Sequence, residues 1–359
     1  MGALRRSHAA AFTILAALLL LLLARLPPGP YAPPRAPRPA SLPLRTSSPP
    51  PERNRTVAPP QTAPPPPPSK AQLPPAPAPS PRDPNVVYTR DVYVSGHERP
   101  HPELCPSLGA HLRLLVLVTS APSHASARDA VRLTWGHYAA RSDVALAFVL
   151  GSPPASLRPA LDAEDALYGD VIVGRSIDSY SNLTLKTLSM LEWVDTYCPR
   201  APRLLKTDDD MFINVPRLLG FASAPGRVNA TKTIWGKVVK KSLPKRTTKS
   251  KYYLSPAQYP ARRLPDFATG PAYLLTADAV RALLAEAPSE RYVRLEDVFV
   301  TGVLATRAGV RRVHAPEFYN KKVSAHPCAI QRGIAVHMVR YHEQFDMWRK
   351  LLDGRTKCA

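Results

Sequence analysis

Short apolar runs alternate with segments of helical spacing along the C-terminal part of the chain. The runs typical of buried strands lie at residues 112–118, 144–150, 170–173 and 203–205. Helical spacing or cap signals mark residues 128–136, 182–197, 278–285 and 298–307. Strands that alternate with helices predict an α/β fold with a mostly parallel central sheet and helices on both faces. Ligands of such sheets bind beyond the carboxyl ends of the strands.

The N-terminus carries a single apolar run instead of an alternating pattern. Residues 9–24 follow Arg5 and Arg6, and their length is short for a membrane helix, which needs about 20 residues. The small-residue cleavage site of a signal peptide is poorly met. The pattern therefore favours an uncleaved transmembrane anchor over a cleaved signal peptide. Basic residues on its N-terminal side predict that residues 1–8 are a cytosolic tail.

Proline separates this anchor from the rest of the chain. Of the 43 prolines, 24 lie between Pro27 and Pro84. Proline lacks a backbone donor and fixes its own torsion, so we expect residues 25–104 to be an extended stem without a core, irregular up to Pro106. Residues 105–359 are left as a lumenal catalytic domain. This layout predicts a single-pass membrane protein whose folded part lies on the lumenal side.

Cysteine usage agrees with a lumenal domain. The chain has four cysteines, Cys105, Cys198, Cys328 and Cys358, without the close pairs of a zinc site. Their even number fits up to two disulfides in an oxidising compartment, with the pairing left open. Three Asn-x-Ser/Thr sequons are also present, each a glycosylation site only if it is exposed there.

A net charge of +21 raises the question of a nucleic-acid partner. The cations are divided between the stem and a second cluster at residues 237–251. A lumenal domain does not meet nucleic acid, so we expect no such partner. The second cluster is interpreted as a mobile, solvated loop. The alternative is that it attracts a nucleotide phosphate or an acidic acceptor.

Three consecutive carboxylates are the strongest candidate for chemistry. Asp208, Asp209 and Asp210 come where a buried strand ends and another apolar run begins. Adjacent negative charges repel one another unless a cation or solvent compensates. Hard oxygen ligands of this kind suit a divalent metal that can hold the phosphates of a nucleotide. The alternative is an acidic surface turn.

Three residues elsewhere are candidates for ligand contact. Arg128 and Arg132 are four residues apart and share one helix face. Paired guanidinium groups past a strand are equally consistent with phosphate binding and with surface charge. Gly270, in a loop that runs into a strand, allows close approach of the backbone to a ligand.

Two further positions are ambiguous when taken alone. Glu296 and Asp297 precede a helix, where a carboxylate is either a cap or a catalytic base. His337 lies in an apolar segment, where a histidine is more often a core residue than a ligand.

The order of four motifs resembles the β-1,3-galactosyltransferase family. The motifs are RDAVRLTWG at 128–136, DSYSNLTLKT at 178–187, KTDDDMFIN at 206–214 and LEDV at 295–298. The resemblance extends from about Leu112 to Trp348. It implies a GT-A fold and inverting transfer of a sugar from a UDP donor to the 3-hydroxyl of a glycan acceptor, with Mn²⁺. The anchor and stem resemble the layout of a type II Golgi membrane protein.

The same resemblance implies a role for individual residues. Asp210 and His337 look like the manganese ligands, with Asp208 as the other outer member of the DxD motif. Asp297 looks like the general base and Glu296 like its neighbour in the pocket. The residues that resemble the donor site of the family are Arg128, Arg132, Asp178, Lys186, Asp208, Asp209 and Gly270.

Donor preference rests on one tetrapeptide. Leu295–Val298 favours transfer of galactose over transfer of N-acetylglucosamine, since the sister branch more often has paired aspartates. The resemblance to the family implies a HexNAc-terminated glycan as the acceptor. The alternatives are a β-1,3-N-acetylglucosaminyltransferase and an inactive lumenal glycan-binding protein.

Overall fold

The computed structural model describes residues 86–324, 326–356 and 358. These residues belong to one compact unit, Ala76–Ala359. The predicted cytosolic tail, the anchor at 9–24 and most of the stem lie outside the described residues. Within the described part, no helix combines the length and apolar character needed to cross a membrane.

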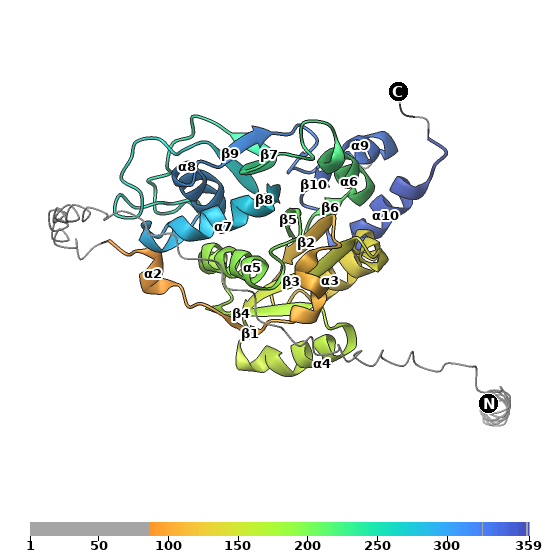
Figure 1. Cartoon of the computed structure of the whole chain (residues 1–359), viewed down its shortest axis with the longest axis horizontal. Coiled ribbons are helices and arrows are strands. Elements are labelled where there is room, and N and C mark those ends of the chain that lie inside the picture. The colour runs from red at the N-terminus through yellow and green to blue at the C-terminus, as the bar shows by residue number, and fades with distance from the viewer. Residues whose placement is uncertain (1–85, 325, 357, 359) are drawn as a thin grey trace, which may run out of the picture. The chain divides into compact units, whose positions relative to one another are not determined.

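An eight-stranded sheet runs through the middle of the domain (Figure 1). In order across the sheet its strands are β1 (His97–Arg99), β4 (Val171–Ile177), β3 (Val144–Ser152), β2 (Leu114–Thr119), β5 (Arg203–Asp208), β8 (Phe267–Thr276), β7 (Thr233–Val239) and β9 (Arg311–His314). Strands β4, β3, β2 and β5 are parallel, as are β7 and β9. The pairs β1–β4, β5–β8 and β7–β8 are antiparallel. The predicted mostly parallel sheet is confirmed.

Two hydrophobic cores cover opposite faces of the sheet, because successive strand residues point to opposite sides. Leu115 and Leu117 of β2 face one core, and Leu114 and Val116 face the other. The first core is closed by α5 (Leu183–Tyr197), α7 (Ala277–Glu286) and a π-helical segment (Val298–Leu304) that continues into α8 (Ala305–Arg307). The second is closed by α3 (Ala125–Arg132), α4 (Arg158–Tyr168), α6 (Val215–Ser223), α9 (Pro327–Arg332) and α10 (Tyr341–Leu352) (Figure 1).

Three sequence predictions need correction. The segment before Pro106 is not irregular: it contains α2 (Thr89–Val92), and β1 pairs with the edge of the sheet. The helix predicted at 128–136 ends at Arg132, because Thr134 leaves the helical region and a 3-10 turn follows. The helix predicted at 298–307 begins with π-helical geometry. The other 3-10 turns are Pro102–Leu104, Pro106–Gly109, Ala155–Leu157, Tyr180–Asn182 and Ala287–Ser289.

Two disulfides tie the ends of the domain to its helices. Cys105 is bonded to Cys198, just after α5, and Cys328 in α9 is bonded to Cys358. The expectation of two disulfides is confirmed. A separate two-stranded sheet joins β6 (Phe212–Ile213) to β10 (Ala335–Val336).

Candidate active site

A cleft of about 340 Å³ opens where β2 and β5 end. Its lining brings together residues that are far apart in the sequence: Thr119, Asp208, Asp210, Gly270, Glu296, Asp297 and His337. A neighbouring hollow of about 330 Å³ shares Thr119, Asp208 and Asp210 with it and adds Asp178, Lys186 and Asp209. Most of the predicted site residues therefore surround one continuous depression at the carboxyl ends of parallel strands.

The small sheet explains why His337 lies beside Asp210. Strand β10 runs antiparallel to β6, with Val336 opposite Phe212, so the chain after β10 returns to the end of β5. The backbone N–H of Val339 donates to the Asp210 carbonyl at 2.9 Å. His337 Nε2 then lies 3.3 Å from Asp210 Oδ2, and both side chains are partly exposed in the cleft. Burial opposes protonation of His337, but the Asp210 carboxylate outweighs it and raises the pKa of the imidazole.

Asp208 is held by neighbours on both sides. Thr119 is its partner in the register of β2 and β5, and the Thr119 hydroxyl donates to Asp208 Oδ1 at 2.5 Å. Lys206 Nζ donates to the same oxygen at 2.5 Å and to the Gly270 carbonyl at 2.8 Å. Burial disfavours the charge on Lys206, but Asp208 and Glu296 together raise its pKa. Lys206 thus stays charged and links the aspartates to the opposite wall of the cleft.

Asp209 points away from Asp210 and is satisfied within the chain. Its Oδ2 accepts hydrogen bonds from Ser120 Oγ at 2.7 Å and from His124 Nδ1 at 2.9 Å. The hydrogen bond to Asp209 raises the pKa of His124, against the effect of burial. The three adjacent aspartates therefore occupy three different environments, and Asp210 is the one that faces the cleft together with a histidine.

Glu296 and Asp297 form the opposite wall. Tyr273 donates its hydroxyl to Glu296 Oε1 at 2.6 Å, and Lys206 Nζ lies 4.0 Å from Oε2. Burial raises the pKa of Glu296 to about 7. Asp297 accepts from the backbone N–H groups of Val298 at 2.9 Å and Gly270 at 3.3 Å. Burial raises the pKa of Asp297 above its usual value, although these two donors oppose the shift.

Gly270 allows the backbone of β8 to lie close to Glu296 and Asp297. A Cβ at this position would lie 3.1 Å from Glu296 Oε2 and 3.6 Å from Asp297 Cβ. A larger residue would push the acidic pair away from β8. The sequence prediction of a close backbone approach therefore applies to the cleft wall.

Lys186 and Asp178 form a buried pair beside the second hollow. Lys186 Nζ lies 2.6 Å from Asp178 Oδ2 and donates to the Ser120 carbonyl at 2.7 Å. Asp178 Oδ2 also accepts from the Gly151 backbone N–H at 2.7 Å. Both residues lie at the predicted donor side, where they fix the loop after β2.

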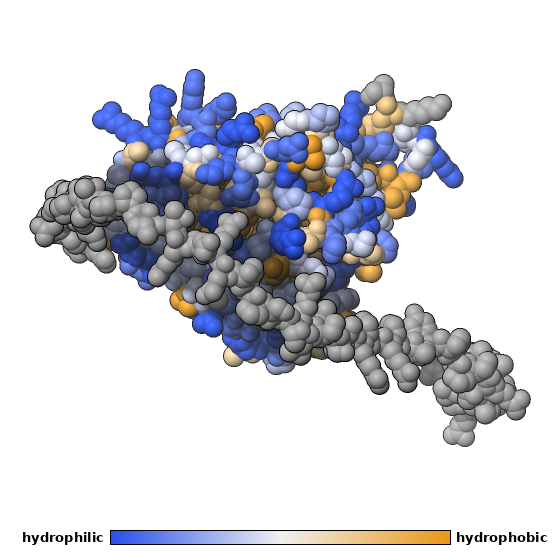
Figure 2. Space-filling view, in the orientation of Figure 1, coloured by the Kyte–Doolittle hydropathy of each residue, from blue (hydrophilic) through white to orange (hydrophobic). Residues whose placement is uncertain are grey.

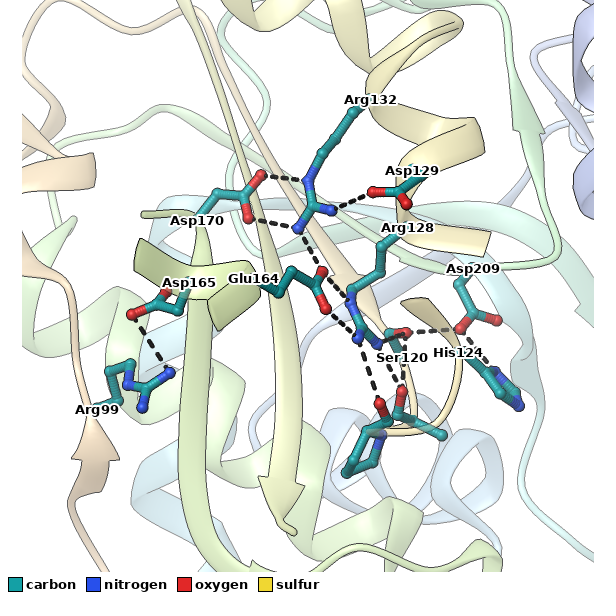
Figure 3. Close-up of polar contacts among 12 residues, drawn as sticks. Arg99, Ser120, His124, Arg128, Asp129, Arg132, Glu164, Asp165, Asp170 and Asp209 are labelled. Carbon is teal, nitrogen blue, oxygen red and sulfur yellow. Dashed lines mark hydrogen bonds and ion pairs between the residues drawn. The ribbon is translucent and has the colours of Figure 1, made fainter. Parts of the chain in front are cut away.

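The two arginines are placed differently from the sequence prediction. Figure 3 shows both guanidinium groups directed at carboxylates outside the cleft. Arg128 is fully buried and bonds to Glu164 at 2.6 and 2.7 Å. Arg132 bonds to both oxygens of Asp170 and to Glu164. Arg128 also donates to the Ala121 carbonyl at 2.6 Å, so it supports the loop that carries Ser120. Arg132 is therefore not placed to contact a ligand in the cleft.

Several residues that line the cleft were not among the predicted site residues. Lys206 interrupts the apolar run of β5, and a charged residue in a buried strand was the available signal. Tyr180, Lys251, Tyr252 and Arg294 also line the cleft. Their loops carry no periodic pattern that would place them at the cleft, although Lys251 belongs to the basic cluster at 237–251 for which attraction of an anion was the alternative interpretation.

Candidate metal ligands in the described residues are few. No group of three or more His, Cys, Asp or Glu side chains in this part of the chain has the arrangement of a metal site. The pair formed by Asp210 and His337 offers one oxygen and one nitrogen donor, both open to the cleft.

Comparison with solved structures returns distant likenesses. A glycosyltransferase involved in the glycosylation of the major capsid of PBCV-1 has a TM-score of 0.38 and 12% identity, covering 67% of this chain and 99% of its own. The galactosyltransferase LgtC has a TM-score of 0.34 and 8% identity, covering 65% of this chain and 94% of its own.

Sequence relatives are much nearer. Beta-1,3-galactosyltransferase 4 of Rattus norvegicus is 35% identical over 68% of this chain and 71% of its own length. Beta-1,3-galactosyltransferase 5 of Homo sapiens is 33% identical over 67% of this chain and 79% of its own. N-acetyllactosaminide beta-1,3-N-acetylglucosaminyltransferase 4 of Homo sapiens is 33% identical over 68% and 67%. The sequence profile described as Galactosyltransferase matches residues 126–316. This chain therefore belongs to the galactosyltransferase family and is a glycosyltransferase, whose α/β fold has a mostly parallel central sheet.

Proposed function

We propose that this protein is a β-1,3-galactosyltransferase that moves galactose from UDP-galactose, with inversion, to the 3-hydroxyl of a HexNAc-terminated glycan. Relatives that are named β-1,3-galactosyltransferases support this activity. The observation that carries the proposal is the single cleft in which Asp297 faces the pair Asp210 and His337. A carboxylate on one wall and a candidate cation site on the other suit a reaction between a nucleotide sugar and a hydroxyl.

In this proposal Asp297 is the general base. It takes the proton of the acceptor 3-hydroxyl while the hydroxyl oxygen bonds to the anomeric carbon of galactose. The bond from that carbon to UDP breaks with its electrons going to the phosphate oxygen, so attack from the opposite face inverts the configuration. The N–H groups of Val298 and Gly270 fix the carboxylate. Its raised pKa makes it a better proton acceptor than an exposed aspartate.

Glu296 and Lys206 have a supporting role in this mechanism. With a pKa of about 7, Glu296 is partly protonated at neutral pH, which limits repulsion of the neighbouring Asp297. Lys206 bonds to Asp208 and to the carbonyl of Gly270. These contacts hold the two walls at a constant separation while substrates enter and leave.

We also propose that the site uses Mn²⁺. Asp210 and His337 would hold it, with Asp208 nearby as the other outer member of the acidic motif. An oxygen and a nitrogen donor fit this ion, and two protein donors leave room for oxygen atoms of a bound diphosphate. When bound, the ion supplies a Lewis acid that neutralises charge on the departing UDP.

Transfer of N-acetylglucosamine is the second candidate. One relative of similar identity is named a β-1,3-N-acetylglucosaminyltransferase. Offering equal concentrations of UDP-galactose and UDP-N-acetylglucosamine to the purified protein with one acceptor distinguishes the two. We expect galactose to dominate the product. A product that carries mainly N-acetylglucosamine would establish the second candidate instead.

The location that we propose is the Golgi membrane, with the catalytic domain in the lumen and the apolar run at 9–24 as a type II anchor. The arrangement of tail, anchor and stem in the sequence supports this topology. Protease treatment of sealed Golgi vesicles should leave the domain intact, and permeabilised vesicles should lose it. Digestion in sealed vesicles would contradict the topology.

The proposed activity is tested by a screen of donors against acceptors, with Mn²⁺ and with chelator. We expect UDP-galactose turnover that stops when the cation is removed, with a β-1,3 linkage in the product. Glycan binding that needs neither UDP nor a cation, in the absence of any turnover, would favour an inactive glycan-binding protein.

A further inference from the structure

The loop between β7 and β8 has an unusual charge. Residues 211–265 contain no aspartate or glutamate, whereas lysine and arginine recur from Lys232 to Arg263. Figure 2 shows hydrophilic residues projecting from the edge of the molecule at which Figure 1 draws this loop. Such a concentration of one sign of charge raises the local concentration of anions.

The lysine side chains of the loop are exposed, as the predicted solvated loop requires, but its backbone is held beside the cleft. Arg294, next to the acidic pair of the cleft wall, donates to the carbonyls of Lys251 at 2.6 Å and Tyr253 at 3.1 Å. Arg246 donates to the Leu254 carbonyl at 2.8 Å, and the Leu254 side chain is fully buried. The segment around residue 251 is therefore fixed beside the cleft.

Three exposed lysines on this segment form what we call the cationic rim: Lys245, Lys249 and Lys251. Lys251 lines the cleft itself. Lys245 pairs with Tyr253 in an isolated bridge, and Lys249 lies in the turn between them. The lysine ion pairs of the described residues belong to Lys186, Lys206, Lys322 and Lys350. The rim is thus without a carboxylate partner in that part of the chain.

Two tyrosines stand beside the rim at the mouth of the cleft. Tyr180 and Tyr252 line the cleft, yet they are 55% and 49% exposed. Lys251 Nζ lies 4.9 Å from the centre of the Tyr252 ring. Exposed aromatic rings next to a few polar groups are typical of a binding surface.

We propose that the cationic rim and the two tyrosines form an acceptor subsite for an anionic glycan. The glycan carries a carboxylate, sulfate or phosphate group on a sugar beyond the one that receives galactose. This inference rests on the proposed function, and it adds the class of acceptor.

The distribution of charge gives the acceptor an orientation. The inner lining of the cleft is acidic, with Asp208 and Asp210 on one wall and Asp297 on the other, whereas the cationic rim at its mouth is basic. The anionic distal group of such a glycan is attracted by the cationic rim and repelled by the carboxylates inside the cleft, whereas its neutral reactive end is not repelled. The reactive hydroxyl then enters toward Asp297 while the tyrosine rings contact the intervening sugar.

The experiment compares matched acceptors with the full-length chain. One oligosaccharide is used in a neutral, a sulfated and a uronic-acid form, and kcat/KM is measured for each at low and at high salt. We expect both anionic forms to exceed the neutral form at low salt, by up to about fivefold for each lysine contact. Salt at 1 M should remove the preference, because the screening length falls to about 3 Å.

Variants then assign the preference to residues. Lys251→Gln, and the triple variant that adds Lys245→Gln and Lys249→Gln, should lower the ratio of anionic to neutral acceptor in steps. Arg217→Gln removes an exposed charge on α6, outside the cleft lining, and serves as the matched control with an unchanged ratio. Lys251→Arg keeps the charge and should retain the preference. Preference for only one anionic form would identify which group the rim accepts.

Other results would overturn the inference. Equal kcat/KM for neutral and anionic forms would do so, with the proposed function intact. A rise in KM for UDP-galactose in Lys251→Gln, with no change in acceptor preference, would place the rim at the donor phosphates instead. Binding of anionic lipid vesicles through the same lysines, again without acceptor preference, would make the rim a membrane contact. No transfer to any acceptor would reject the proposed function and the acceptor subsite with it.

Discussion

Two groups of charged side chains contact the segment at the end of β2, yet they are built in opposite ways. In one, Arg128 and Arg132 meet Glu164 and Asp170, and each charge has a partner at about 2.6–2.9 Å. In the other, Asp210 is partly exposed in the cleft, and its ion-pair partner among the described residues is the imidazole of His337. The first group is closed, and the second is open to a ligand.

The difference shows what a charged motif can and cannot reveal. The sequence around Arg128 is as characteristic of the family as the one around Asp210, but its charges are neutralised inside the protein. A charge acts on a ligand only where the fold leaves it uncompensated. The closed group fixes the loop of Ser120, through the bond from Arg128 to the Ala121 carbonyl, and so supports the open group from behind.

The largest effect on the open group is expected at Asp297. Asp297→Asn keeps a side chain that can cap the following helix but removes the proton acceptor, so kcat should fall about 10²- to 10⁴-fold. Steady-state transfer assays measure this loss, with circular dichroism as the test of folding. A well-folded variant with nearly normal kcat would mean that Asp297 is a helix cap only.

Substitutions in the closed group should lower the free energy of unfolding and not the rate of the catalytic step. Arg128→Met removes the donor of the Ala121 carbonyl and leaves Glu164 with Arg132 as its remaining partner in a buried place, so the free energy of unfolding should fall by about 3–5 kcal/mol. Urea unfolding measures this change. Asp129→Asn is the control, because its pair with Arg132 is partly exposed and worth less than about 1 kcal/mol. A stable Arg128→Met protein with a raised KM for UDP-galactose would show that Arg128 belongs to the donor site.

The Mn²⁺ concentration needed for activity should distinguish Asp210 from the adjacent Asp209. Asp210→Ala should raise the Mn²⁺ concentration for half-maximal activity by at least about tenfold, and His337→Ala should do the same. Asp209→Asn should have a smaller effect, because Asp209 bonds to Ser120 and His124 within the chain. Titrations of activity with Mn²⁺ after chelation measure these shifts. Equal shifts in all three variants would remove the distinction between Asp209 and Asp210.

The smallest expected effect is the pH dependence caused by Glu296. Its pKa is about 7 in the folded protein, above the ordinary value of 4.5, so the folded state binds more protons between these two pH values. The free energy of unfolding therefore falls as the pH rises through this window, by no more than about 1.4 kcal/mol per pH unit. Glu296→Gln should remove this part of the decline in urea titrations from pH 5 to 8. An identical pH slope in the variant would show that Glu296 is not the titrating group.

Much of the central sheet could be predicted from the sequence because β2, β3, β4 and β5 are buried on both faces. Their apolar runs are local signals, and the intervening α5 carries apolar residues at helical spacing, although the helix is buried on most sides. The edge strand β1 was missed because an edge strand needs no apolar run. The π-helical start of the segment at Val298 depends on packing with β8, which no local pattern records.

The site was less accessible to local reasoning. Its residue types were recognisable, but the contact of Asp210 with His337 depends on the pairing of β6 and β10, across more than a hundred residues. The partners of Arg128 and Arg132 lie in α4 and before β4, so the sequence could not show that their charges are satisfied. Resemblance to a family placed His337 near the metal, whereas pattern alone favoured a core residue.

One covalent link has a practical consequence for anyone who shortens this chain. The bond from Cys328 to Cys358 closes a ring of backbone that includes β10, His337 and α10. A truncation that removes Cys358 would break this disulfide and release the segment that carries His337, although Cys358 is distant in sequence from any cleft residue. Fusions for purification or labelling should therefore leave Cys358 in place.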